Sequence, residues 1–299
     1  MNMLKTAQIL LVIAFATLPT KSFAYLLWEI NDTAVSEKVR YGPCQDTIGF
    51  GGNIIASNIR HNGKCNGDGY APEVATENGN KFLKFKSNNP NPVPNQRPGK
   101  TRSEIAHTGF QLNFGQRYYI GFRMKIPSGV DPVGPSKAFY LMQLWQCSDL
   151  SPIAGIRMND YADRTINFMS QNEWGSASFN REDTGSRDVS LNDNGSNDGW
   201  HEFVIKLKIH PRSGGQLSEF VVWKDGVGTP IIDSSPNHGG RNYGYFTWNS
   251  CPTKYYNQRP PQHARLKFGI YKDKETGKNF EVQYDNFKVG EYYSNVKPW

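Results

Sequence analysis

After the first 24 residues, apolar and polar residues alternate with a period of two along most of the chain, and helical periodicity is scarce. Loops rich in Gly, Pro, Asn and Asp, such as 88–98 and 192–199, separate the alternating segments. The pattern predicts strands at 81–86, 101–107, 117–126, 138–146, 153–158, 165–170, 200–210, 218–224, 264–272 and 280–291. Many short strands without intervening helices favour an all-β fold, a jelly-roll sandwich of two antiparallel sheets with a concave groove.

Residues 1–24 have a different pattern from the rest of the chain. A positively charged start, an apolar run over 9–18 and small residues at Ser22 and Ala24 are typical of a secretory signal peptide. The alternative is an uncleaved anchor, but the apolar run is short for a bilayer span. We therefore expect a secreted protein, extracellular or periplasmic, with no membrane contact after cleavage. Because no repeat or interdomain linker is evident, we expect one domain over 25–299.

The chain contains four cysteines, all of them after the predicted signal peptide. An even number of cysteines in an exported chain favours disulfides, and four cysteines allow three pairings. We favour Cys44–Cys65 as a local bond and Cys147–Cys251 as a long-range one. The close C-x-x-C spacing of zinc sites is absent. The oxygen-rich segment 192–198 could hold a structural Ca²⁺, although a polar turn is the simpler interpretation, so we expect no cofactor or metal.

The charge balance indicates the kind of partner. Lys5 and Lys21 are the only charged residues of the predicted signal peptide, so cleavage lowers the formal net charge from +7 to +5. A positive net charge on an exported protein suggests an anionic partner. The sequence has no dense Lys/Arg block and no predicted recognition helix, which argues against nucleic acid. The spread of Arg and Lys among many aromatic residues, which make up 13% of the chain, fits an anionic polysaccharide as the partner. We expect the protein to be a monomer.

Alternation also divides each predicted strand into two faces. In 264–272 the side chains expected in the core are Leu266, Phe268 and Ile270. The opposite face of that strand carries Arg265, Lys267, Gly269 and Tyr271. In 138–146 the rule assigns to the core Tyr140, Met142 and Leu144, and to the opposite face Phe139, Leu141, Gln143 and Trp145. A solvated face usually carries Ser, Thr, Lys and Glu, so Tyr, Trp and Gln in their place suggest a sugar-binding groove.

Two more predicted strands place charged residues on one face. In 101–107, Arg102 and Glu104 share a face, and in 117–126 Arg123 lies on the face opposite Phe122. Gly269 lies between Lys267 and Tyr271, where the missing side chain is expected to let a sugar approach the sheet.

Three segments carry a resemblance to a known family. They are 102–105 (RSEI), 143–146 (QLWQ) and 267–271 (KFGIY). In this order they resemble the three signature strands of the jelly-roll polysaccharide lyases, which in the alginate lyases have the patterns R-[ST]-E-[LV], Q-[IV]-H and K-A-G-x-Y. Segments 198–204 and 222–226 make the chain more similar to the heparin-lyase-I-like and glucuronan-lyase group, and the resemblance covers roughly 75–290.

The resemblance implies a polysaccharide lyase, a carbon–oxygen lyase. Such an enzyme cleaves a uronic-acid-containing anionic polysaccharide (alginate, glucuronan or a glycosaminoglycan-like polymer) by β-elimination. The C5 proton of a uronate is a very weak acid, because its removal puts a second negative charge beside a carboxylate. The enzyme must therefore neutralise that carboxylate with donors aimed at the enolate-like state. It must also place a base at C5 and an acid at the departing O4.

The resemblance also implies roles for individual residues. Gln143 would donate to the uronate carboxylate, Arg102 would supply positive charge, and Tyr271 would transfer the proton. An ordinary Tyr titrates near pH 10, and nearby cations would favour its phenolate form. The residues expected to bind substrate or to support the catalytic three are Glu104, Trp145, Lys267, Arg265, Arg123, Tyr255 and Arg241. The last two belong to the long aromatic loop 237–263, which is too long for a neutral connector.

The chain departs from the alginate-lyase pattern at Trp145, which stands where those enzymes carry a His that neutralises the carboxylate or acts as base. A single Tyr serving as both base and acid would suit a syn elimination without that His. Each residue also has a structural interpretation: a salt bridge for Arg102 and Glu104, and an aromatic platform for Tyr271. Two other function classes stay open, a non-catalytic lectin-like protein on the same scaffold and a hydrolase with an unrecognised carboxylate pair.

Overall fold

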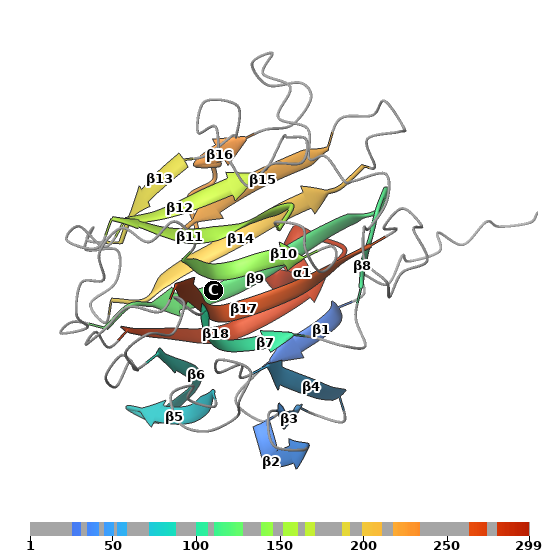
Figure 1. Cartoon of the computed structure of the whole chain (residues 1–299). Helices are drawn as coiled ribbons and strands as arrows, with labels where there is room; N and C mark the ends of the chain where they lie inside the picture. Colours follow the sequence, from blue (N-terminus) through green and yellow to red (C-terminus); the bar gives the residue numbers. More distant parts are fainter. Residues whose placement is uncertain are drawn as a thin grey trace, which may run out of the picture.

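The computed structural model shows two β-sheets packed face to face (Figure 1). It describes residues 26–30, 35–41, 45–50, 53–58, 72–87, 100–106, 111–127, 139–145, 152–160, 165–170, 187–191, 199–210, 218–233, 263–273 and 280–298. Outside these residues lie several predicted features, namely the signal peptide 1–24, the segment 192–198, Arg241, Tyr255 and the cysteines Cys44, Cys65, Cys147 and Cys251. The expectations that concern them stay predictions.

The first sheet has eight strands, and its neighbours are antiparallel. In spatial order its strands are β16 (Ile232–Asp233), β15 (Glu219–Lys224), β14 (His201–Lys208), β9 (Arg117–Lys125), β18 (Phe280–Gly290), β6 (Asn80–Ser87) and β5 (Glu73–Glu77), with β1 (Leu26–Ile30) also paired to β18.

The second sheet has ten strands and is also antiparallel. Its order is β13 (Arg187–Ser190), β12 (Thr165–Ser170), β11 (Ala154–Asp160), β10 (Tyr140–Trp145), β17 (His263–Asp273), β7 (Lys100–Ala106), β4 (Asn53–Asn58), β3 (Gln45–Phe50) and β2 (Val35–Tyr41), with β8 (Leu112–Asn113) also paired to β17. Strands β10, β17 and β7, which carry the three motif segments, are neighbours at the centre of this sheet (Figure 1).

The predicted all-β sandwich of two antiparallel sheets is confirmed, and each of the predicted strands is present. The strands that alternation did not predict are β1 to β5, β8, β13 and β16. Strands β8 and β16 have two residues each, which is too short for a period of two to be visible in the sequence.

The core between the sheets contains a connected group of stacked and tilted aromatic rings among aliphatic side chains. Phe268 on β17 stacks on Phe287 on β18 with ring centroids 4.2 Å apart, and Phe287 stacks in turn on Phe122 at 5.4 Å. Leu266 and Ile270 are buried beside Phe268, as the alternation of 264–272 predicts. Because one face of β17 is fixed in the core, its other face points away from the eight-stranded sheet.

A short C-terminal helix, α1 (Tyr293–Val296), lies against the outer face of the eight-stranded sheet. The backbone of Val296 approaches Gly121 on β9 so closely that a Cβ at Gly121 would overlap it. Tyr293 packs edge-on against Tyr119 and Trp223 on the same face. Within the described part of the chain, no helix is long and apolar enough to cross a membrane.

Candidate active site

The outer face of the ten-stranded sheet, called the site face below, carries a row of side chains from three neighbouring strands, β11, β10 and β17. In the strand register, Tyr140 on β10 lies opposite Arg157 on β11 and opposite Tyr271 on β17. Tyr271 lies opposite Arg102 on β7, whose side chain is outside the described part of the structure. The register therefore aligns two phenols between two arginine positions.

A second group lies further along the same strands. Gln143 on β10 lies opposite Lys267 on β17, and Trp145 lies opposite Arg265. The Nζ of Lys267 is 4.1 Å from the centre of the Trp145 ring, and the guanidinium carbon of Arg265 is 5.9 Å from it. Both contacts are cation–π interactions. They hold two positive charges on one side of Tyr271.

Gln143 and Glu104 meet over β17, although they belong to the strands on either side of it. The Nε2 of Gln143 donates a hydrogen bond to Oε1 of Glu104, and the two residues are 3% and 2% exposed. A carboxylate can only accept hydrogen bonds, so the NH₂ group of Gln143 must face Glu104. The bond therefore fixes the orientation of the Gln143 amide.

Gly269 occupies this crossing point, directly opposite Glu104 in the ladder. It has a φ of +125°, a conformation that residues with a Cβ rarely adopt. A Cβ at Gly269 would lie 2.6 Å from Cδ1 of the core residue Phe85 and would overlap the carbonyl oxygen of Ser103. The expectation that the missing side chain opens the sheet to a sugar is therefore wrong, because the missing side chain would point into the core.

Tyr140 was expected in the core, but it lies beside Tyr271 instead. The ladder shifts register between Tyr140 and Met142, so both Leu141 and Met142 are buried in the core and Tyr140 is on the site face. The hydroxyl of Tyr284, on the other sheet, donates a 2.8 Å hydrogen bond to the carbonyl of Leu141 and so holds the irregular segment from within the core.

The rings of the two tyrosines in this row stack on each other. The rings of Tyr140 and Tyr271 are 6.1 Å apart between centroids and inclined by 16°, and the guanidinium carbon of Arg157 lies 5.1 Å from the centre of the Tyr140 ring. Burial and the neighbouring Tyr271 raise the pKa of Tyr140, Arg157 opposes them, and the result is a pKa of about 12. Tyr140 is therefore a protonated phenol at neutral pH.

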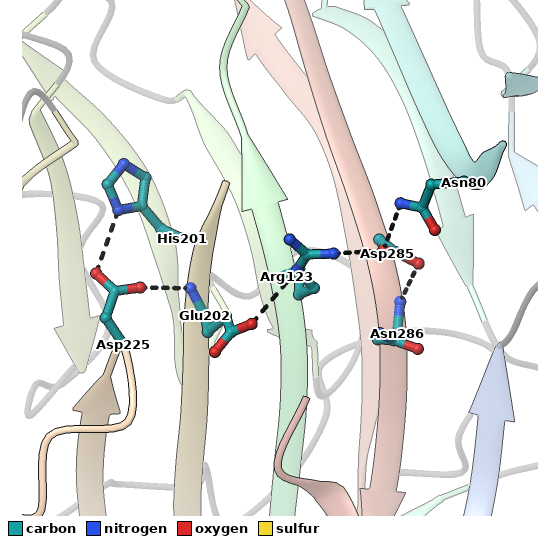
Figure 2. Close-up of polar contacts among 7 residues, drawn as sticks. All are labelled: Asn80, Arg123, His201, Glu202, Asp225, Asp285 and Asn286. Atoms are coloured by element: carbon teal, nitrogen blue, oxygen red, sulfur yellow. Dashed lines mark hydrogen bonds and ion pairs between the residues drawn. The ribbon is translucent and has the colours of Figure 1, made fainter. Parts of the chain in front are cut away.

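Arg123 does not join this group. It lies on β9, on the outer face of the eight-stranded sheet, where its guanidinium pairs with Glu202 at 3.5 Å and with Asp285 at 3.3 Å (Figure 2). Its guanidinium carbon is also 5.3 Å from the centre of the Trp200 ring. Asp285 accepts further hydrogen bonds from Asn80 and from the backbone N–H of Asn286. These contacts make Arg123 part of a structural network on the far sheet.

A comparison of the sequence with known protein families covers the strands that carry the site. Residues 57–288, well over half of the chain, match the polysaccharide lyase family. The chain belongs to the polysaccharide lyase family. It is therefore a lyase that acts on a polysaccharide, as the three motif segments predict.

Several solved structures are similar to this lyase. The endo-β-1,4-glucuronan lyase of the fungus Trichoderma reesei is 17% identical, with a TM-score of 0.49 over 81% of this chain and 97% of the fungal one. The alginate lyase A1-II′ is 12% identical, with a TM-score of 0.42 over 73% of this chain and 83% of its own. An alginate lyase from Pseudomonas aeruginosa is 13% identical, with a TM-score of 0.39 over 71% and 83%. No curated protein matches the chain in sequence.

None of the three histidines in the described part of the lyase lies near Tyr271. His201 is buried on β14, in the other sheet, where its ring nitrogens contact Asp225 and the carbonyl of Leu191. His210 follows the end of β14. His263 begins β17, eight residues from Tyr271, so it lies about 26 Å away along the strand.

Sequence reasoning missed Tyr140 and Arg157 as members of the site face. Arg157 gave a usable signal, because it is the one charged residue in the otherwise apolar strand 153–158. Tyr140 gave none, because regular alternation places it in the core and only the register shift in β10 moves it.

Proposed function

We propose that this lyase cleaves a uronic-acid-containing anionic polysaccharide by β-elimination, with Tyr271 transferring the proton. The observation that carries the proposal is the position of Tyr271 on the site face. This phenol is partly exposed and lies on the same face as the buried Gln143–Glu104 pair and the cations Lys267 and Arg265.

The carboxylate of the bound uronate would be neutralised before the proton leaves. The amide of Gln143 keeps a second N–H besides the one given to Glu104, and this N–H would donate to the carboxylate. Lys267 lies opposite Gln143 in the ladder and would add positive charge close to the same group. Arg102, opposite Tyr271, would approach from the other side. Stabilising the second negative charge in this way lowers the barrier to removal of the C5 proton.

Tyr271 would then serve as both base and acid. Its phenolate takes the C5 proton, the electron pair of the C–H bond forms the C4–C5 double bond, and the C4–O4 bond breaks as the pair on O4 departs. The new phenol returns its proton to O4, so the enzyme ends the cycle as it began. A syn elimination of this kind needs one proton-transfer group on one face of the sugar. It accounts for Trp145 at the position where alginate lyases carry a His.

The choice of polymer is tested with a panel of alginate, glucuronan and heparin, following the ultraviolet absorbance of the new C4–C5 double bond. We expect at least one polyuronate to give the chromophore. The matched control is the same polymer with its carboxyl groups reduced to alcohols, which should stay intact because it has no carboxylate and no acidic C5 proton. New reducing ends without the chromophore would indicate a hydrolase. Binding without cleavage of any polymer would indicate a lectin, and either result would contradict the proposal.

We also propose that the enzyme is exported and contains disulfide bonds. The pattern of residues 1–24 supports secretion with cleavage after Ala24. In an oxidising compartment we expect the bonds Cys44–Cys65 and Cys147–Cys251. We also expect a monomer whose activity persists in EDTA, because cationic side chains do the neutralising. The amino-terminal sequence of the secreted protein, peptide mass mapping under non-reducing conditions and sedimentation test these points separately.

A further inference from the structure

We propose that Tyr140 is a positioning residue that holds the ring of Tyr271 in its working orientation, with Arg157 closing the stack from the other side. The inference rests on the proposed function, in which Tyr271 transfers the proton. It assigns a task to two residues that the three signature segments do not contain.

The geometry of the row supports this task. Tyr140 lies between Arg157 and Tyr271 in the register of β11, β10 and β17. Its ring is nearly parallel to that of Tyr271, inclined by 16° at a centroid distance of 6.1 Å, which is an offset-stacked arrangement. The guanidinium carbon of Arg157 is 5.1 Å from the same ring. A planar group on each side therefore restricts how far the Tyr140 ring can turn, and Tyr140 in turn restricts Tyr271.

Burial separates the roles of the two tyrosines. Tyr140 is only 3% exposed, whereas Tyr271 is partly exposed. A polymer bound on the site face would meet the more exposed ring of Tyr271, and Tyr140, whose ring lies between Tyr271 and the guanidinium of Arg157, is assigned a role through Tyr271. In the part of the chain that the structure describes, the charged and titratable groups that interact with Tyr140 are Arg157 from β11 and Tyr271 from β17. With a pKa of about 12, Tyr140 stays protonated and presents an uncharged face to its neighbour.

The backbone is shaped to deliver Tyr140 to this place. A regular β10 would put Tyr140 in the core, and the register shift next to Leu141 turns it outward. The hydrogen bond from Tyr284 to the carbonyl of Leu141 anchors the shifted segment from the opposite sheet. The same bond also satisfies the buried carbonyl of Leu141 and the buried hydroxyl of Tyr284, so the shifted backbone is stable within the core.

Two substitutions separate the ring from its hydroxyl. Tyr140→Phe keeps the stacked ring, and we expect kcat within about twofold of the wild type. Tyr140→Leu removes the flat partner, and we expect kcat to fall about tenfold with little change in KM, because the loss concerns orientation in the transition state. The matched control is Tyr119→Leu, which removes an aromatic-packed tyrosine from the outer face of the other sheet and should leave kcat unchanged.

A spectroscopic readout tests the contact without turnover. In protein with ¹³C-labelled tyrosine, the Tyr271 resonance is assigned from its absence in Tyr271→Phe. It should shift in Tyr140→Leu, which removes the neighbouring ring current, and stay in place in Tyr119→Leu. Should Tyr140→Leu fail to fold, Arg157→Met opens the stack from its outer side and should lower kcat about threefold with little change in KM.

The outcomes are distinguishable. Wild-type kcat and an unmoved Tyr271 resonance in Tyr140→Leu would overturn the positioning role and leave the proposed function intact. A Tyr140→Phe enzyme as slow as Tyr140→Leu would overturn it as well, because the hydroxyl and not the ring would then matter. Full activity in Tyr271→Phe would overturn the proposed function itself.

Discussion

Gln143 and Glu104 form a hydrogen bond with each other across an intervening strand. Two strand spacings separate β10 from β7, about 10 Å, so both side chains must lean over β17 to meet. They can do so because the backbone at Gly269, opposite Glu104, directs no side chain toward the site face. The φ of +125° at this glycine would direct any Cβ into the core. The glycine of the KFGIY segment therefore helps to build the site through its backbone conformation.

Substituting Gly269 should damage both stability and activity. In Gly269→Ala the Cβ would meet the Phe85 ring and the Ser103 carbonyl at a positive φ, so we expect a loss of about 2–4 kcal/mol. The control is Gly79→Ala, where φ is also positive (+82°) but no atom lies within 4 Å of the added Cβ. Thermal unfolding measures both variants. Equal Tm values for the two would contradict the close contact at Gly269.

Glu104 should act on catalysis through Gln143. In Glu104→Leu the amide of Gln143 loses its acceptor, and we expect kcat to fall about tenfold or more, with a stability loss of about 1–3 kcal/mol. Glu104→Gln offers a carbonyl oxygen in the same place and should recover a large part of kcat. Steady-state kinetics at equal concentrations of folded enzyme separates the loss of kcat from the loss of stability. If Glu104→Leu kept the wild-type kcat, the contribution of Gln143 to catalysis would not depend on its hydrogen bond with Glu104.

Two arginines that the sequence assigns to the same task should respond differently. Arg265→Met removes a cation from the site face beside Trp145, so KM for a polyuronate should rise about fivefold or more and depend less on salt. Arg123→Met should leave KM unchanged and lower stability by about 2 kcal/mol, because the buried carboxylate of Asp285 loses its cationic partner. A rise in KM for Arg123→Met would show that Arg123 contributes to substrate binding and would contradict its assignment to a structural network.

The lowered pKa of Asp225 predicts how the stability of the folded protein depends on pH. Its burial tends to raise the pKa, but hydrogen bonds from His201, from the backbone N–H of Glu202 and from Lys224 outweigh burial and bring the pKa to about 2. Figure 2 shows the contacts with His201 and Glu202. An unfolded Asp has a pKa of about 3.9. Asp225 therefore stabilises the folded state above that pH, by at most about 2.6 kcal/mol, and this contribution is lost as the pH falls from about 5 to 2.

The matched variant is Asp225→Asn, since Asn tolerates the positive φ of 50° at this position. Its apparent Tm should lie below that of the wild type at pH 7, and the gap should close as the pH approaches 2. A gap of constant size across this range would show that the ionisation of Asp225 does not contribute.

The fold was accessible to sequence reasoning because strand alternation is a local property. The strand 264–272 shows this best: Leu266, Phe268 and Ile270 are buried as expected, and Lys267 and Tyr271 lie on the opposite face. The same rule fails where the ladder shifts register. It misplaced Tyr140, because no local signal in the segment marks an irregular pairing with two neighbouring strands.

The site was only partly accessible, because alternation assigns a face of one strand but not the sheet to which the strand belongs. Arg102 and Arg123 looked alike as positive residues on polar faces. The structure places them in different sheets, β7 in the ten-stranded one and β9 in the eight-stranded one. Gly269 was found as a special position, but its meaning depended on a φ value and on Phe85 from another strand, neither of which the sequence encodes locally.

The substitution Tyr271→Phe tests the central claim most directly. It removes one hydroxyl from a partly exposed ring and keeps the stacking with Tyr140. On the polyuronate that the wild type cleaves, we expect the ultraviolet signal of the C4–C5 double bond to disappear, while binding of the polymer in a direct assay stays within about threefold of the wild type. A Tyr271→Phe enzyme that forms the double bond at the wild-type rate would contradict the account.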